Sequence, residues 1–181
     1  MPNIEIEYYS LITPEKHEEL NQFLIQNAED FGEDNKESYY FLLEGKTFKV
    51  VNNISKNSAK IVLKIGRIGE GDFFDETEVS IAPEEYENTV KIFTNILPCP
   101  FIKSFQERHN FNYKGVDISV KYSDEWDHHV ELETLVNDLA EKEMADKKIF
   151  EVAEELGLKI LTIKEAKALT EKIERESRQG I

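Results

Sequence analysis

Apolar and polar residues alternate along much of the chain with the period of two that is typical of β-strands. In segment 3–9, Ile4, Ile6 and Tyr8 lie on one face of the predicted strand, and the acidic Glu5 and Glu7 lie on the other. Similar alternation or short apolar runs predict seven more strands, at 38–43, 46–51, 59–65, 74–81, 102–111, 116–122 and 128–135. Eight strands in mostly antiparallel order, interrupted by helices, indicate an α+β fold in a single domain, 1–181.

Other segments carry helix signals instead. Thr13 and Pro14 suit the N-cap and first position of a helix that runs to residue 28, and Pro83 opens a second one. The tail predicts helices at 136–156 and 163–176, separated at Gly157, a residue that commonly ends a helix. Segment 28–36 is interpreted as a loop, and the glycines between 66 and 71 as a turn.

Composition excludes several classes of protein. The chain has 37 acidic and 22 basic residues, a net charge of −15 and 40% hydrophobic residues, which indicates a folded acidic domain. Such a charge argues against nucleic acid or an anionic membrane as a partner. The single cysteine, Cys99, excludes an intramolecular disulfide and a Cys-rich zinc site, and the start of the chain lacks a signal-peptide pattern. We expect a cytoplasmic monomer or homodimer.

Three of the predicted strands carry the motif Glu-x-Glu. Because side chains alternate along a strand, both carboxylates of each pair lie on the same face. Neighbouring strands carry single cations with the same alternation. The acidic residues are Glu5, Glu7, Glu76, Glu78, Glu131 and Glu133, and the cations are Lys49, Lys60, Lys64, Lys121 and Arg108.

Two interpretations of these charges stay open. In the first, they lie on the solvated face of a sheet and form ordinary cross-strand ion pairs. In the second, the sheet closes into an eight-stranded antiparallel β-barrel, with a polar lumen and helices packed outside. A lumen with carboxylates opposite Lys and Arg suits a polyphosphate held through Mg²⁺ or Mn²⁺.

The ordered set of these motifs resembles the CYTH domain, the triphosphate tunnel metalloenzyme family of class IV adenylate cyclases and thiamine or inorganic triphosphatases. The resemblance spans essentially the whole chain. The matching segments are Glu5-Ile6-Glu7, Ile61-Val62-Leu63-Lys64, Glu76-Thr77-Glu78, Arg108, Glu131-Leu132-Glu133 and Leu156-Gly157-Leu158.

The resemblance implies a metal-dependent protein that binds triphosphate and hydrolyses it by in-line attack on phosphorus. It implies that Mg²⁺ or Mn²⁺ is held by Glu5, Glu7, Glu131 and Glu133, with Glu76 and Glu78 assisting. It further implies that Lys49, Lys60, Lys64, Lys121 and Arg108 bind the triphosphate, and that Glu131, Glu133 and Arg108 act in catalysis. The substrate would be inorganic triphosphate, thiamine triphosphate or a nucleotide.

The chain departs from the family pattern at four positions, which marks it as a divergent member. Tyr9, Val51 and Gln106 stand where the family has basic residues, and Lys121 stands where it has an acidic one. Three other functions therefore stay open beside hydrolysis: a non-catalytic polyphosphate or nucleotide module, a class IV adenylate cyclase, and an acidic interaction domain.

Two weaker signals have simpler interpretations. Gly45-Lys46-Thr47 resembles the end of a phosphate-binding loop, but Tyr40 occupies the position of its first glycine, so we expect no P-loop. Trp126 can stack on a base and His129 shares the face of Glu131, but packing is the commoner role of such residues.

Overall fold

The computed structural model describes residues 4–65 and 73–179. In these residues the chain forms nine strands, four α-helices and two short 3₁₀ turns, Pro83–Glu85 and Leu139–Glu141. The strands are β1 (Ile4–Leu11), β2 (Glu29–Glu33), β3 (Lys36–Phe41), β4 (Lys46–Asn53), β5 (Ser58–Ile65), β6 (Phe73–Ile81), β7 (Phe101–Tyr113), β8 (Val116–Ser123) and β9 (Asp127–Val136). The helices are α1 (Pro14–Asn27), α2 (Tyr86–Ile96), α3 (Lys142–Glu155) and α4 (Ile163–Gln179).

The α+β class and the bounds of all eight predicted strands agree with the sequence patterns to within two residues, but two segments differ. Glu29–Glu33, predicted as loop, is the short strand β2, which pairs with the C-terminal half of β7. The helix predicted from residue 136 begins at Lys142, because β9 continues to Val136. The glycine-rich turn predicted at 66–71 lies outside the described residues.

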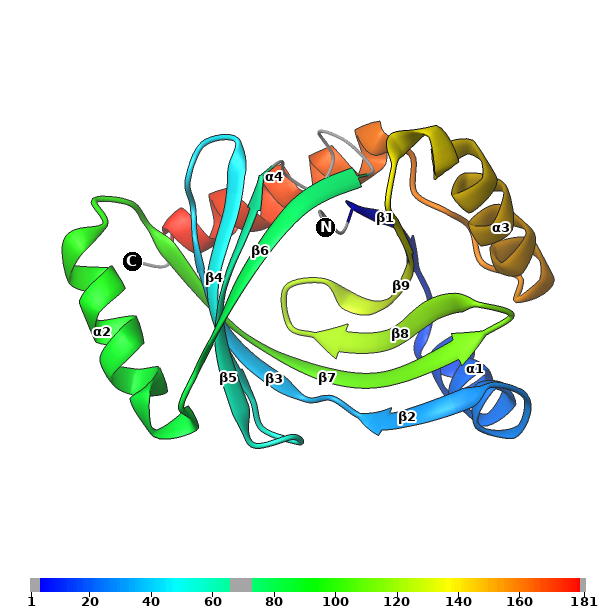
Figure 1. The fold of residues 1–181 in the computed structure, drawn as a ribbon, viewed down its shortest axis with the longest axis horizontal. Helices are drawn as coiled ribbons and strands as arrows, with labels where there is room; N and C mark the ends of the chain where they lie inside the picture. Colours follow the sequence, from blue (N-terminus) through cyan, green and yellow to red (C-terminus); the bar gives the residue numbers. More distant parts are fainter. Residues whose placement is uncertain (1–3, 66–72, 180–181) are drawn as a thin grey trace.

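All strands belong to one antiparallel sheet, in the order β2-β7-β3-β4-β5-β6-β1-β9-β8, with a further pairing of β7 and β8. The sheet curls strongly on itself (Figure 1). Two strand pairs are joined over part of their length in the residues that the structure describes: β1 pairs with β6 through Ile4–Ile6, where the described part of β6 begins at Phe73, and β7 pairs with β8 from Glu107 onward. The expectation of a closed barrel therefore holds only in part, since the strands form a curled half-barrel.

Helices cover the apolar outer face of this sheet, as predicted. The larger core cluster packs α1 and α3 against β1, β7, β8 and β9, with Ile6, Phe111, Leu132 and Ile149 fully buried. A second cluster packs α2 against β3, β4 and β5, at the other end of the molecule (Figure 1). Because the apolar residues of each strand face these helices, the alternating polar residues face the hollow of the curled sheet.

Local sequence signals fix the ends of the helices. The Thr13 hydroxyl accepts a hydrogen bond from the main-chain N–H of Lys16, as an N-cap does. Thr162 and Glu165 form a capping box: the Thr162 Oγ1 accepts from the Glu165 N–H, and the Glu165 carboxylate accepts from the Thr162 N–H. Gly157 has a positive φ of 66°, so it ends α3 in the conformation that glycine adopts at low cost. Gly45 also has a positive φ and lies in the turn before β4. Lys46 and Thr47 therefore belong to this strand, and the segment is not a P-loop.

Candidate functional site

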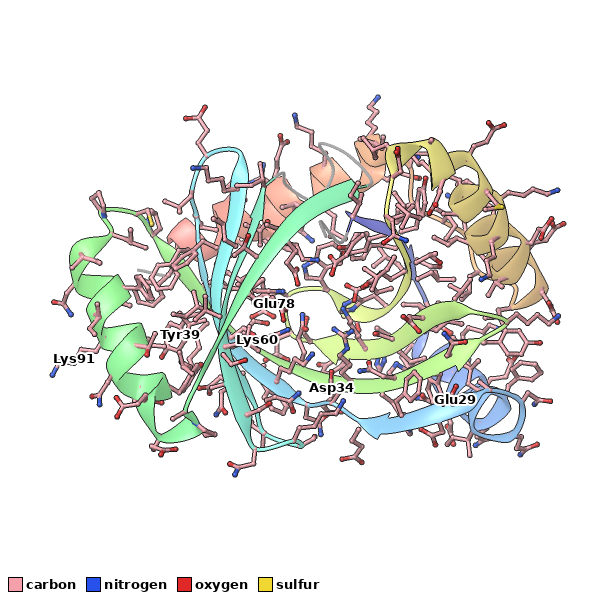
Figure 2. The ribbon with its side chains drawn as sticks, viewed as in Figure 1. Glu29, Asp34, Tyr39, Lys60, Glu78 and Lys91 are labelled. Carbon is pink, nitrogen blue, oxygen red and sulfur yellow. The ribbon has the colours of Figure 1, made fainter. Side chains whose placement is uncertain are left out.

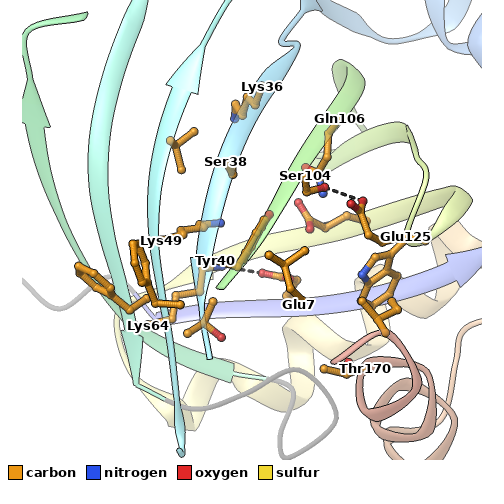
Figure 3. Close-up of a pocket in the computed structure, with 18 of the residues that line it drawn as sticks. Glu7, Lys36, Ser38, Tyr40, Lys49, Lys64, Ser104, Gln106, Glu125 and Thr170 are labelled. Atoms are coloured by element: carbon orange, nitrogen blue, oxygen red, sulfur yellow. Dashed lines mark hydrogen bonds and ion pairs between the residues drawn. The ribbon is translucent and has the colours of Figure 1, made fainter. Parts of the chain in front are cut away.

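A cavity of about 300 Å³ lies in the hollow of the curled sheet, bordered by residues of α4 such as Thr170 (Figure 3). Every site residue predicted from the sequence lines it: Glu5, Glu7, Lys49, Lys60, Lys64, Glu76, Glu78, Arg108, Lys121, Glu131 and Glu133. The first interpretation of these charges, an outer solvated face, is therefore wrong for the buried residues, whereas Lys60 and Glu78 form a partly exposed cross-strand ion pair of the kind it describes. The predicted charges converge on one cavity from strands on all sides of it.

Strand alternation and register bring the acidic residues together. On β1, Ile6 is fully buried under the helices while Glu5 and Glu7 face the cavity. Glu7 lies opposite Glu133 in the pairing of β1 with β9, and Lys64 lies opposite Glu76 in the pairing of β5 with β6. Residues far apart in the sequence therefore become neighbours in the sheet.

Four of these glutamates form what we call the acidic cluster: Glu5, Glu7, Glu76 and Glu133. Carboxylate oxygens of Glu5, Glu7 and Glu133 lie within 4.8 Å of one another, close enough to share one cation. The Lys64 Nζ lies among them, 2.5 Å from Glu5 Oε2, 2.9 Å from Glu7 Oε2 and 3.2 Å from Glu76 Oε2. One ammonium thus serves several buried carboxylates.

Crowding of like charges shifts the acid–base properties of the acidic cluster. Burial, together with the neighbouring Glu5 and Glu7, raises the pKa of Glu133 to about 8. Burial also raises the pKa of Glu7, although Lys64 acts against it, and the pKa of Glu76 is raised for the same reason. The same carboxylates raise the pKa of Lys64 well above its ordinary value, against the effect of its burial. Among the described residues, the carboxylates of the acidic cluster therefore outnumber the ammonium groups that pair with them.

Cations gather on the opposite side of the cavity in what we call the basic cluster: Lys36, Arg108 and Lys121. Arg108 and Lys121 lie directly opposite each other in the pairing of β7 with β8. Both contact Glu131, whose Oε2 is 2.5 Å from Lys121 Nζ and whose Oε1 is 3.3 Å from the Arg108 Nη2. Burial alone would raise the pKa of Glu131, but Lys121, Arg108 and Lys64 hold it well below its usual range. Burial and the nearby Arg108 lower the pKa of Lys121 to about 8.

Sequence reasoning missed Lys36, which was assigned to a loop, and the buried Asp34 beside it. Lys36 lines the cavity, and its Nζ lies 2.6 Å from Asp34 Oδ2. The signal that could have identified them was the pattern Asp34-x-Lys36 directly before a strand, which places both side chains on the same face.

The remaining predicted cations are more exposed. Lys60 pairs with Glu78 across β5 and β6, and both side chains lie near the middle of the molecule in Figure 2. Lys49 lies over the Tyr40 ring, with its Nζ 5.6 Å from the ring centroid. These three charges border the cavity without the dense contacts of the two clusters.

Aromatic residues border the cavity beside Glu131. The Trp126 ring lies 5.3 Å from the ring centroids of both Tyr9 and His129. The His129 Nδ1 lies 2.8 Å from the Asp127 carbonyl oxygen, and burial lowers the pKa of this imidazole to about 4. His129 is therefore neutral near pH 7, with Nδ1 donating the hydrogen bond. Phe111, by contrast, is fully buried in the larger core cluster, where packing is its role.

Comparison with known proteins identifies the architecture. No sequence profile of a known family and no curated protein sequence matches the chain. Among solved structures, a conserved hypothetical protein of Pyrococcus furiosus superposes with a TM-score of 0.72 at 24% identity, covering 86% of this chain and 91% of its own. An adenylate cyclase candidate of Vibrio parahaemolyticus has a TM-score of 0.65 at 14% identity, covering 87% and 91%. An adenylyl cyclase candidate of Hippeastrum, described as having a dominant triphosphatase activity, has a TM-score of 0.63 at 13% identity, covering 87% and 89%.

The chain has a CYTH-like fold. The four positions where it departs from the CYTH pattern, namely Tyr9, Val51, Gln106 and Lys121, all line the cavity. These four departures therefore lie where a ligand would bind. Among its described residues, no helix is long and apolar enough to cross a membrane.

Proposed function

We propose that this protein binds a triphosphate together with a divalent cation, Mg²⁺ or Mn²⁺, and hydrolyses it. The observation that carries the proposal is the division of one cavity into an acidic and a basic cluster. A polyphosphate chelated by a metal ion presents both positive and negative charge, and so complements both clusters at once. The CYTH-like fold, shared with a neighbour described as a triphosphatase, supports the same proposal.

The residues present suit a hard divalent cation. Glu5, Glu7 and Glu133 offer carboxylate oxygens within 4.8 Å of one another, and oxygen ligands are those that Mg²⁺ and Mn²⁺ prefer. The Lys64 ammonium between Glu5 and Glu7 already acts as a cation at this place. When bound, the ion would neutralise phosphate charge and polarise a phosphoryl oxygen. Glu131 is a further candidate ligand on the basic side, and Glu76 and Glu78 are outer ones.

On the basic side, the chain's own residues would hold the phosphates and stabilise charge during attack. Arg108 and Lys121 would contact phosphoryl oxygens, with Lys49, Lys60 and Lys64 around them. Hydrolysis would proceed by in-line attack of water on a phosphorus, and the accumulating negative charge on the leaving group would be met by Arg108. Positioning and charge neutralisation thus supply most of the catalysis. Glu131 and Glu133 would orient the reacting groups.

Phosphate release from tripolyphosphate, thiamine triphosphate and ATP, with Mg²⁺ or Mn²⁺, tests this proposal. Titration calorimetry with the same ligands runs in parallel. We expect release that depends on the metal and falls at least about 100-fold in the variant E131Q/E133Q. Glu37→Gln is the matched control, because Glu37 does not line the cavity. Absence of both binding and release with every triphosphate and metal would overturn the proposal.

A non-catalytic triphosphate-binding module is the second candidate, favoured by the pairing of Lys121 with Glu131. The Lys121 Nζ lies 2.5 Å from the Glu131 Oε2, so this carboxylate is already paired and is less available to act in hydrolysis. Binding of triphosphate without release would support the module. Formation of cyclic AMP from ATP would instead indicate a cyclase.

A further inference from the structure

Lys36 lies at the first position of β3 and faces the cavity. In the strand register it lies opposite Gln106 of β7 on one side and Asn53 of β4 on the other. Figure 3 shows Lys36 and Gln106 at the same part of the pocket. Only 17% of the Lys36 side chain is exposed. Its neutral neighbours leave Asp34 as its ion-pair partner among the described residues.

Asp34 is held in a single orientation by the surrounding chain. Its Oδ1 accepts a hydrogen bond from Asn53 Nδ2 at 2.5 Å, and its Oδ2 accepts one from Asn110 Nδ2 at 2.8 Å. Its main-chain N–H donates to the Arg108 carbonyl oxygen at 2.7 Å. Asp34 is 3% exposed, so this carboxylate is a rigid buried anchor for Lys36.

The same carboxylate is shared by too many cations. Besides Lys36, it contacts Lys56 Nζ at 3.2 Å and Arg108 Nε at 3.5 Å. Arg108 also contacts Glu131, but that carboxylate is shared with Lys121. The three cations of the basic cluster therefore share two carboxylates, Asp34 and Glu131, and the exposed Lys56 also contacts Asp34. Buried charge without full compensation is costly, and a bound anion would remove the cost.

Of the two lysines on Asp34, only Lys36 lines the cavity. Lys56 approaches Asp34 from outside, and 48% of its side chain is exposed. Lys103 and Lys114 do not line the cavity, since Lys103 pairs with Glu37 and Lys114 pairs with Glu155. Of these four lysines, only Lys36 lines the cavity, and it extends the basic cluster to β3.

We propose that Lys36 binds a phosphoryl group of the substrate beside Arg108, and that Asp34 is the positioning residue for both side chains. This inference rests on the proposed function, and it adds a phosphate contact that comes from β3. Gln106, which lies opposite Lys36 in the strand pairing, carries no charge, so Lys36 supplies the cation at this place. The ligand class is an inorganic or organic polyphosphate.

Calorimetric titration of the full chain with tripolyphosphate and Mg²⁺ tests the inference. We expect Lys36→Gln to weaken binding at least about tenfold, because a charge-assisted contact is lost, while Lys36→Arg stays within about threefold. Lys56→Gln is the matched control, since it removes a cation from the same Asp34 without touching the cavity, and we expect wild-type affinity. Equal weakening by K36Q and K56Q would show a structural role through Asp34 and would overturn the inference.

A variant that places the lysine at position 106 of β7 in place of position 36 of β3 gives a second readout. In the double variant K36Q/Q106K, a lysine on the opposite strand restores the cation, and we expect most of the lost affinity to return. Asp34→Asn should weaken binding in the wild-type background and weaken it less in K36Q, because the part of its effect that acts through Lys36 is then absent and only the part through Arg108 remains. Additive effects would contradict the positioning role. If K36Q does not fold, the same titrations use Lys36→Met, which removes the charge and keeps the apolar part of the side chain.

The outcomes separate this inference from the proposed function. If the wild type binds no tripolyphosphate, the proposed function fails and the role of Lys36 fails with it. If the wild type binds and K36Q binds equally well, only the role of Lys36 is overturned.

Discussion

The two sides of the cavity bury charge in different ways. Among the described residues, the acidic cluster, on β1, β6 and β9, pairs three of its four carboxylates with one ammonium, that of Lys64. The basic cluster, on β3, β7 and β8, gives its three cations two carboxylates, which are further held by hydrogen bonds or ion pairs. The acidic side responds by raised carboxyl pKa values, as at Glu133, and the basic side by lowered lysine pKa values, as at Lys36 and Lys121.

This difference indicates what each side lacks. Burial of like charges is unfavourable, and each cluster lowers its own charge by shifting protons toward the neutral forms. A divalent cation would relieve the acidic cluster and a phosphate anion the basic one. A site evolved only for stability would instead pair its charges one to one. The following predictions test this unequal number of carboxylates and cations in each cluster.

The largest expected effect concerns Lys64, the cation that three carboxylates of the acidic cluster share. Lys64→Met leaves Glu5, Glu7 and Glu76 without their shared ammonium, so we expect the free energy of unfolding to fall by about 3–5 kcal/mol. Urea denaturation measures it. Added Mn²⁺ should restore part of the loss, since the ion takes the place of the lost charge. Lys114→Met, whose lysine pairs with Glu155 at the surface, is the control with little change. An equal effect of both variants would contradict the special role of Lys64.

The second prediction concerns metal affinity. The variant E5Q/E7Q removes two of the three carboxylates that converge within 4.8 Å, so we expect Mn²⁺ binding to weaken at least about 100-fold. Calorimetry of the metal alone measures it. Glu37→Gln, outside the cavity, should bind Mn²⁺ like the wild type. Unchanged binding in E5Q/E7Q would place any metal elsewhere.

Much of the acidic side could be predicted from the sequence. Strict alternation at 3–9 decides which face Glu5 and Glu7 occupy, and the same rule applies to Glu131 and Glu133. Because apolar residues must be covered by helices, the polar face of each strand is left to the hollow of the sheet. All eleven predicted residues consequently reached one cavity, although their individual roles stay predictions.

The basic side was harder to predict, for a physical reason. Segment 28–36 is acidic and contains Gly32, so its local signals favour a loop, and only pairing with the distant β7 makes Glu29–Glu33 a strand. That pairing also determines where Asp34 and Lys36 point. The curling of the sheet into a half-barrel that is not fully closed is likewise a tertiary property with no pattern in any single strand.

The third prediction concerns pH. With the pKa of Glu133 near 8 in the folded protein and an ordinary value of 4.5 when unfolded, the native state alone keeps this proton between these pH values. The contribution of Glu133 to stability should therefore fall as pH rises from about 4.5 to about 8, so the metal-free wild type should lose stability relative to Glu133→Gln over this window. Urea denaturation across this range measures it. Mn²⁺ affinity should rise with pH over the same window, because the ion must displace the proton. An identical slope in wild type and variant would contradict the raised pKa.

The smallest effect is expected at the exposed pair Lys60 and Glu78, which borders both the cavity and solvent. Their side chains are 36% and 41% exposed, so water screens them and the pair should contribute at most about 1 kcal/mol to stability. Lys60→Gln should thus change the urea midpoint little, whereas Lys121→Gln, whose side chain is 5% exposed, should lower it clearly because Glu131 stays buried. If K60Q proved as destabilising as K121Q, burial would not be what separates these two ion pairs. The contrast between unbalanced clusters and an ordinary surface pair would then lose its physical basis.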